Sequence, residues 1–241
     1  MTFTIVAADP GTGLVGLCQG TSAMGVASRC THVRSGVAAV ASQSHSDWRI
    51  GRRALDLVGS WLEPDATLRA LATTDAHFGH RQVGVVTPDG RVGAHTGPSC
   101  GPYAAHRTGD AYAVLGNLLV GQGVLDAMAE RYEASRASGA EGVTAEIFAD
   151  RLLGAVEAGL AAGGEGVTHL SSTVVVAGPA SPRPLLDLRV DVAPVGGDAI
   201  PELRRIVEQF APFVDYYADY WLDHPDVTPE QWREQGSPTT R

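Results

Sequence analysis

All eighteen basic side chains of this 241-residue chain are arginines, so the sequence contains no lysine. Chemistry that needs a lysine, either as a Schiff base or as a general base, is therefore excluded. The amine that remains titratable near neutral pH is the α-amino group of the chain itself, whose ordinary pKa is about 8. An amine base in this protein must accordingly act at the N-terminus.

Two pairs of polar residues stand where predicted strands end. Gln43 and Ser44 close a buried strand, where they either orient the amide of a substrate or make ordinary strand-end hydrogen bonds. Gly116 and Asn117 follow a later strand. A backbone N–H and a side-chain amide at this place can stabilise an oxyanion, and the alternative is a turn that requires a positive φ.

Another predicted strand ends at His95 and Thr96, and Cys100 and His106 follow it. Imidazoles serve as acid–base groups or as metal ligands. The two histidines are eleven residues apart and have no acidic partner in register, which favours structural histidines over a metal centre. We therefore predict no metal and no cofactor. We assign His95, Thr96 and His106 to the substrate-binding site, with Cys100 as an alternative nucleophile.

The composition excludes several classes of partner. The net charge is −9 without a basic cluster, whereas nucleic-acid binding requires a concentrated positive patch. The three cysteines are odd in number and widely spaced, which argues against a disulfide framework and a C-x-x-C metal site. No apolar run approaches the ~20 residues of a membrane span, and the first residues lack the basic region of a signal peptide. We expect a cytoplasmic homodimer that binds a small-molecule substrate, with neither nucleic acid nor membrane as a partner.

Hydrophobic periodicity predicts the elements that position these residues. Phe3, Ile5 and Ala7 alternate with Thr2 and Thr4, which predicts a strand at the start of the chain. The further predicted strands are 14–19, 36–43, 82–87, 91–97, 111–115, 172–177 and 185–192. The predicted helices are 51–62, one that opens at Pro64, one around 124–132, one from Thr144 to Gly159, and one from Pro201 through Phe210. Residues 134–142 are predicted to form a loop, and the chain after His224 a loose polar tail.

Strands that follow one another through short hairpins indicate antiparallel pairing. Helices that arrive in pairs between them must cover the faces of the sheets. The order of elements therefore predicts an α+β fold: a four-layer α/β/β/α sandwich of two antiparallel sheets covered by helices, formed by residues 1–223 and followed by a tail at 224–241. Near its end, Tyr216, Tyr217, Tyr220 and Trp221 predict either core packing or a dimer contact.

Five segments, in order over residues 2–210, carry a family resemblance: MTFTIVAADPGTGLVGL, GVAAVASQS, RQVGVVTPDGRVGAHTG, CGPYAAHRTGDAYAVLGNLL and DLRVDVAP…AIPELRRIV. Together they resemble the domain-of-unknown-function family 1028, which is assigned to the N-terminal-nucleophile (Ntn) hydrolase fold. The resemblance implies a four-layer fold with a nucleophile at the start of the first strand, which is Thr2 in this chain.

Thr2 becomes the first residue once Met1 is removed, and a small second residue generally allows that removal. Its hydroxyl would then attack, with its own α-amine as the base. Asp9 either orients that amine or serves only its turn. With Asn117 or Ser44 at the oxyanion, the resemblance implies cofactor-free hydrolysis of an amide bond in a small molecule, such as a cyclic amide, a ureide or an acylated amino acid.

The sequence departs from the family pattern at three places. The family more usually has Asn-x-x-Tyr-Gly-Pro where this chain has residues 46–52, and Asp47 in that stretch is expected in the substrate-binding site. Leu115 stands where the family usually has Gln. After the Gly-Gly pair, Glu165 is followed by Gly166-Val167 and Leu170-Ser171, where the family tends to have Arg and Gln-Ser. These changes motivate the alternative, a non-catalytic small-molecule-binding or structural homo-oligomeric protein on the same fold.

Overall fold

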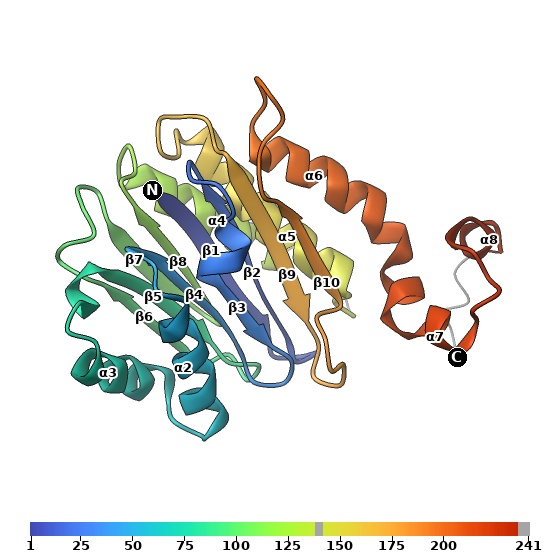
Figure 1. Ribbon diagram of the computed structural model, residues 1–241, viewed down its shortest axis with the longest axis horizontal. Coiled ribbons are helices and arrows are strands. Elements are labelled where there is room, and N and C mark those ends of the chain that lie inside the picture. Colours follow the sequence, from blue (N-terminus) through green and yellow to red (C-terminus); the bar gives the residue numbers. More distant parts are fainter. Residues whose placement is uncertain (138–141, 236–241) are drawn as a thin grey trace.

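The computed structural model describes residues 1–137 and 142–235, and its strands form two antiparallel sheets (Figure 1). The six-stranded sheet has the order β10-β9-β2-β1-β8-β7, with β1 at Thr2–Asp9, β2 at Leu14–Thr21, β7 at Ala105–Gly109, β8 at Tyr112–Asn117, β9 at Ser171–Ala177 and β10 at Leu186–Val190. The four-stranded sheet has the order β3-β4-β5-β6, with β3 at Thr31–Arg34, β4 at Ala38–Ser44, β5 at Arg81–Val86 and β6 at Val92–Thr96. The prediction of an α+β protein with two antiparallel sheets is confirmed.

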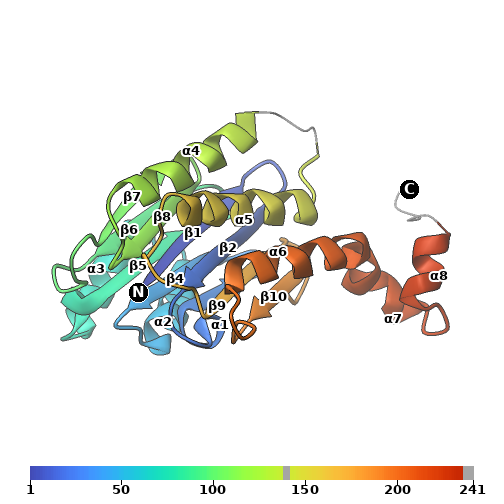
Figure 2. The same cartoon turned by 90° about the horizontal axis from the view of Figure 1, so that it is seen from above.

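Helices cover the outer faces of both sheets (Figure 2). The six-stranded sheet is covered by α4 (Gly123–Ala137), α5 (Ala145–Ala161) and α6 (Ala199–Phe210), and the four-stranded sheet by α2 (Trp48–Gly59) and α3 (Pro64–Thr74). Along β1, Phe3 and Ile5 point into the core beneath the helices, whereas Val6 and Ala8 point into the core between the sheets. The alternation of side chains in a strand therefore places Thr2 and Thr4 on the side that faces the second sheet.

The core between the sheets consists of small aliphatic side chains, which lets the sheets approach closely. Its buried members are Val6, Ala8, Val15, Leu17, Ala39, Ala41, Val86, Ala111, Ala113, Leu115 and Ala177. Gly84 on β5 faces this core, and a Cβ built on it would lie 2.7 Å from Leu115 Cδ1. That distance is too short for two carbon atoms, so a side chain at this position would displace Leu115.

Several elements differ from the sequence-based predictions. The edge strands β3 and β7 and the short helix α1 (Val26–Cys30) were not predicted, because their polar and exposed residues break the apolar pattern. Helix α2 begins three residues before the predicted start, where Asp47 caps it by accepting a hydrogen bond from the Arg49 N–H at 2.9 Å. Helix α4 continues to Ala137, so the predicted loop at 134–142 is wrong for 134–137, while 138–141 lie outside the described residues.

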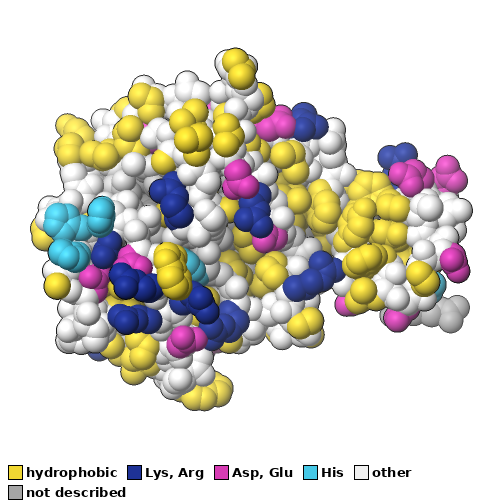
Figure 3. Space-filling model, viewed as in Figure 1, with side chains coloured by type: hydrophobic (Ala, Val, Ile, Leu, Met, Phe, Trp, Pro, Cys, Tyr) yellow, Lys and Arg dark blue, Asp and Glu magenta, His cyan; other side chains and the backbone are white. Residues whose placement is uncertain are grey.

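The C-terminal residues extend away from the sheets (Figures 1 and 2). They comprise a 3-10 turn at Ala211–Phe213, a π-helical turn at Tyr216–Tyr220, α7 (Trp221–Asp223) and α8 (Pro229–Glu234). Hydrophobic side chains gather over this segment on the face seen in Figure 3. Trp221 and Leu222 of the segment are exposed. No helix in residues 1–137 or 142–235 is long and apolar enough to span a membrane.

The prediction of a loose tail after His224 is wrong for α8. Thr228 and Gln231 form a reciprocal capping box, in which each side chain bonds to the backbone of the other residue. The buried Trp232 ring packs 4.4 Å from the ring of Tyr220 and 5.8 Å from that of Tyr216. The helix is therefore held by its cap and by aromatic packing, and residues 236–241 of the predicted tail lie outside the described chain.

Candidate functional site

Thr2 lies at the head of β1, at one end of the space between the sheets. Its side chain is buried, and its Oγ1 is 2.5 Å from the carbonyl oxygen of Met1 and 3.2 Å from Oγ1 of Thr21 on β2. The Thr21 hydroxyl also donates a hydrogen bond to the Met1 carbonyl. One carbonyl oxygen is thus held between two threonine hydroxyls from neighbouring strands.

The same end of the sheet carries polar side chains on four adjacent strands. Thr2 lies directly opposite Asn117 of β8, and Thr21 lies directly opposite Ser171 of β9. Opposed residues of antiparallel strands point to the same face. Pairing therefore places Asn117 and Thr21 on either side of Thr2, with Ser171 next to Thr21, although these residues lie far apart in the sequence.

Beneath Thr2, a buried network of amide side chains joins the two sheets. Gln43 Nε2 donates to Gln82 Oε1 at 2.8 Å, and Asn117 Nδ2 donates to the same oxygen at 3.0 Å. Gln43 Oε1 accepts from Thr4 Oγ1 at 2.5 Å, and Gln19 Nε2 donates to Thr4 Oγ1 at 2.9 Å. Buried amides are costly unless they are paired, so this network fixes the sheet end that carries Thr2.

Gln82 is the centre of this network. Its Nε2 lies 2.8 Å from the Gly116 carbonyl oxygen, 2.9 Å from the Ala105 carbonyl oxygen and 3.0 Å from Thr96 Oγ1. Thr96 Oγ1 is in turn 2.8 Å from Nδ1 of His106. The chain of contacts therefore runs from the interior to His106 on the edge strand β7. Burial and the nearby His95 lower the pKa of His106.

Four other sequence-predicted residues lie away from Thr2. Ser44 ends β4 with φ 71° opposite Arg81, and Asp47 caps α2. The His95 ring stacks on Phe78 at 4.2 Å, on the side of the four-stranded sheet that faces α3. The Cys100 thiol bonds to the Arg81 carbonyl. In the described chain, none of these four side chains hydrogen-bonds to Thr2, Thr21 or Asn117.

Asp9 lies at the opposite end of β1 from Thr2. Its carboxylate accepts hydrogen bonds from the Thr12 N–H at 3.1 Å and from Thr12 Oγ1 at 2.6 Å. These bonds belong to the turn between β1 and β2. The structure therefore decides between the two interpretations of Asp9 in favour of the turn.

The buried Glu165 and His169 and the partly buried Asp198 form a cluster that was not predicted as part of the site. Glu165 Oε2 accepts from the Ser22 N–H at 3.0 Å, and burial raises the pKa of Glu165, although the nearby His169 and the terminal ammonium of Met1 oppose that rise. His169 Nδ1 lies 2.9 Å from Asp198 Oδ2. Burial opposes ionisation of Asp198, but hydrogen bonds from the His169 and Ile200 N–H groups hold its pKa below the ordinary value.

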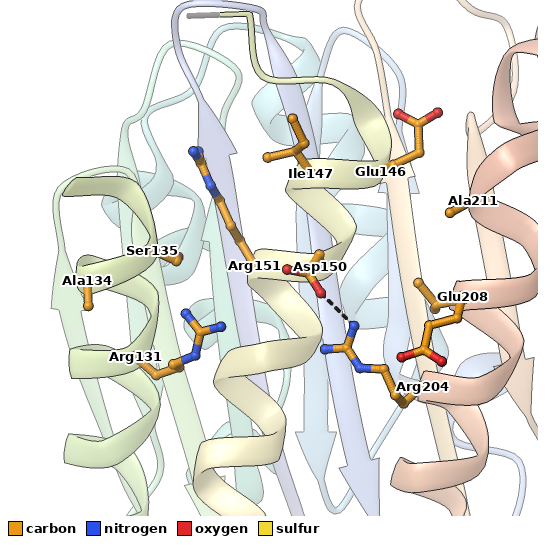
Figure 4. Close-up of a pocket in the computed structure, with 11 residues that line it drawn as sticks. Arg131, Ala134, Ser135, Glu146, Ile147, Asp150, Arg151, Arg204, Glu208 and Ala211 are labelled. Carbon is orange, nitrogen blue, oxygen red and sulfur yellow. Dashed lines mark hydrogen bonds and ion pairs between the residues drawn. The ribbon is translucent and has the colours of Figure 1, made fainter. Parts of the chain in front are cut away.

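Five well-formed cavities of the described residues lie away from Thr2, Thr21 and Asn117. The largest, of about 600 Å³, lies between α4, α5 and α6 (Figure 4). Arg131, Arg151 and Arg204 line it, and Arg204 pairs with Asp150 at 2.5 Å. No three His, Cys, Asp or Glu side chains within residues 1–137 and 142–235 are placed to hold a metal ion.

Comparison with known proteins identifies the family. The model of DUF1028, a family of unknown function, matches residues 2–203, so the chain belongs to this family. Among solved structures, the chain is similar to the DUF1028 protein SPO2555 from Silicibacter pomeroyi, with 26% sequence identity and a TM-score of 0.74 over 87% of this chain and 88% of that chain. No curated protein matches the chain. The family resemblance inferred from the five sequence segments is therefore confirmed.

Proposed function

We propose that this member of DUF1028 is a cofactor-free amide hydrolase, in which Thr2 is the nucleophile once Met1 has been removed. The family resemblance associates the chain with Ntn hydrolases, whose nucleophile opens the first strand of a four-layer fold. Two antiparallel sheets with helices on their outer faces, and a buried hydroxyl at the first position of β1, support this proposal.

The observation that carries the proposal is the position of the Met1 carbonyl between Thr2 Oγ1 and Thr21 Oγ1. This pair of hydroxyls already accommodates a carbonyl oxygen at the head of β1. Removal of Met1 would vacate that position and free the α-amine of Thr2. A substrate amide could then bind beside the freed amine, with its carbonyl oxygen within reach of the Thr21 hydroxyl.

The reaction follows from these groups. Thr2 Oγ attacks the amide carbon and its proton passes to the α-amine, while the Thr21 hydroxyl donates to the developing oxyanion. The C–N bond breaks, the leaving nitrogen takes the proton, and an ester remains on Thr2. Water then attacks that ester, releases the acid and restores the hydroxyl.

Asn117 is the second candidate for an oxyanion donor. Its Nδ2 carries two N–H groups, of which one is used by Gln82 Oε1 at 3.0 Å. Gln43, Gln82 and Gly116 hold this amide in place through the network between the sheets. We propose the same substrates as from the sequence: a cyclic amide, a ureide or an acylated amino acid.

Turnover of a panel of such amides tests the proposal. The full-length protein would be compared with Thr2→Ala, which lacks the hydroxyl, and with Thr2→Ser, which keeps it. Turnover that is lost in Thr2→Ala and partly kept in Thr2→Ser supports the proposal. Equal turnover of the native protein and Thr2→Ala rejects it.

A second candidate function is non-catalytic binding of a small molecule by a homodimer. It is favoured by the cavity of about 600 Å³ between α4, α5 and α6, which lies away from Thr2 and has a volume typical of ligand sites. A purified protein that retains Met1 and binds a metabolite, with affinity lost in Arg151→Ala, would support this function. Light scattering would establish whether the protein is dimeric.

A further inference from the structure

Glu165 is a buried carboxyl group that the reaction above leaves unused. Only 6% of the residue is exposed, and its Oε1 has no hydrogen-bond partner among the described residues. Its Oε2 is bound by the N–H of Ser22, the residue that follows Thr21. Because an unpaired buried oxygen is costly, this atom is suited to a partner that the unprocessed chain does not provide.

His169 and Asp198 fix the surroundings of Glu165. His169 is 1% exposed, its Nδ1 is held by Asp198, and its Nε2 has no partner among the residues described. The ring lies against Gly164, where a Cβ would come within 3.3 Å of Nε2, and it meets the Phe3 ring edge-on at 5.2 Å. The imidazole is therefore packed on two sides next to the backbone of Glu165.

The terminal ammonium of Met1 is a further charged group in this region. Burial raises the pKa of Glu165 and of the Cys30 thiol of α1, and the positive charge of the ammonium opposes both rises. No lysine can compete for this position. Geometry also places Glu165 near the head of β1: Ser22, which binds Glu165, follows Thr21, whose hydroxyl lies 3.2 Å from Thr2 Oγ1. The buried carboxyl group and imidazole are therefore neighbours of the first residues of β1.

We propose that Glu165 is the positioning residue for the α-amine of Thr2 in the processed chain, with the Ser22 N–H holding its carboxylate and the His169–Asp198 pair packed beside it. This inference rests on the proposed function and names the group that positions the α-amine, the base of that reaction. The Oε1 atom of Glu165 would accept a hydrogen bond from the amine and stabilise the ammonium that forms when the amine takes the proton of Thr2 Oγ.

The absence of lysine allows a direct test. A protein that begins at Thr2 can be released from a fusion by a protease, and its α-amine is then its single amine. Labelling of its N-terminal peptide by acetic anhydride therefore reports on that amine and does not require turnover. Labelling would be followed against pH in the native protein, Glu165→Gln and Glu165→Asp. Glu130→Gln, which removes one charge from an exposed position of α4, is the matched control.

We expect Glu165→Gln to shift the labelling midpoint to lower pH and to speed labelling at pH 7 by about tenfold, because an opposite charge favours the ammonium. The labelling midpoint of Glu165→Asp should fall between those of Glu165→Gln and the native protein, and the midpoint of Glu130→Gln should match that of the native protein. Unchanged labelling in a folded Glu165→Gln overturns the assignment. If Glu165→Gln fails to fold, Glu165→Asp and Asp198→Asn decide by the same readout, and native midpoints in both overturn it.

The outcomes separate this inference from the proposed function. A shift in labelling together with no amide turnover would keep Glu165 as the holder of the amine and reject the hydrolase. Turnover that depends on Thr2, together with labelling that Glu165→Gln leaves unchanged, would keep the hydrolase and reject the role of Glu165.

Discussion

The hydroxyl oxygens of Thr2 and Thr21 lie 3.2 Å apart on neighbouring strands, and both contact the carbonyl oxygen of Met1. The two residues are nineteen positions apart, and the β1–β2 hairpin brings them together. The first residue of the mature chain would therefore be accompanied by a hydroxyl donor that is fixed by strand pairing. This relationship gives Thr21 a role that the sequence did not suggest.

Thr21→Val should lower kcat far more than it changes KM. The substitution keeps the shape of the side chain and removes the hydroxyl that would donate to the oxyanion, a loss typically worth 10²- to 10³-fold in kcat. Steady-state kinetics on an amide substrate would measure it. Thr173→Val, at another buried strand threonine, is the control, and a kcat for Thr21→Val equal to that of this control would contradict the role.

Gln82→Leu should destabilise the fold. It leaves the buried amides of Gln43 and Asn117 without their shared acceptor, and each unpaired group costs about 1–3 kcal/mol. Urea unfolding would measure a fall of several kcal/mol in the free energy of unfolding. Gln122→Leu, at an exposed position before α4, should unfold like the native protein, and an equally small effect of Gln82→Leu would refute the network.

Gly84→Ala should destabilise the packing of the two sheets. The added methyl group would lie 2.7 Å from Leu115 Cδ1 and 3.1 Å from Val6 Cγ2, and overpacking of a core costs typically 1–3 kcal/mol. Thermal unfolding gives the measurement. Gly121→Ala is the matched control because no atom lies within 4 Å of its Cβ, and a Gly84→Ala protein as stable as this control would count against the close approach of the sheets.

Asp198→Asn should destabilise the protein in a pH-dependent way. Because the folded-state pKa of Asp198 lies below its ordinary value, its charge contributes stability above about pH 3.8 and loses that contribution as the pH falls through the folded pKa. Asparagine keeps the cap of α6 but loses the charged contact with His169. The difference between Asp198→Asn and the native protein in the free energy of unfolding, measured with urea, should therefore be larger at pH 7 than at pH 3.

The exposed Asp223 of α7 supplies the control for this comparison. Asp223→Asn should follow the native protein at both pH values. A difference in the free energy of unfolding between Asp198→Asn and the native protein that stays constant from pH 7 to pH 3 would contradict the lowered pKa of Asp198.

The central strands and the edge strands β6 and β10 were predictable from the sequence, whereas the edge strands β3 and β7 were not. Side chains along residues 2–8 alternate between the two faces of β1, because one face packs under α5 and the other faces the second sheet. In β7, His106 and Thr108 are exposed on an edge, so burial imposes no apolar pattern there. Strand pairing, which the sequence pattern does not display, decides which polar strand ends meet.

The candidate site likewise contains residues that the sequence indicated and residues that it did not. Gln43 and Asn117 were identified from their positions at strand ends, and they meet in the network beneath Thr2. Glu165 escaped notice as a site residue because it sits in a loop without periodicity and contacts Ser22, 143 residues earlier. Such a contact depends on the complete fold, so no local pattern could indicate it.

Intact mass spectrometry of the native protein, quenched in acid during turnover of an amide, tests the central claim most directly. The account predicts a chain that has lost the mass of methionine and gained the acyl group, with the acyl group on the peptide that begins at Thr2. An active protein that retains Met1, or an acyl group mapped to a different residue, would contradict it.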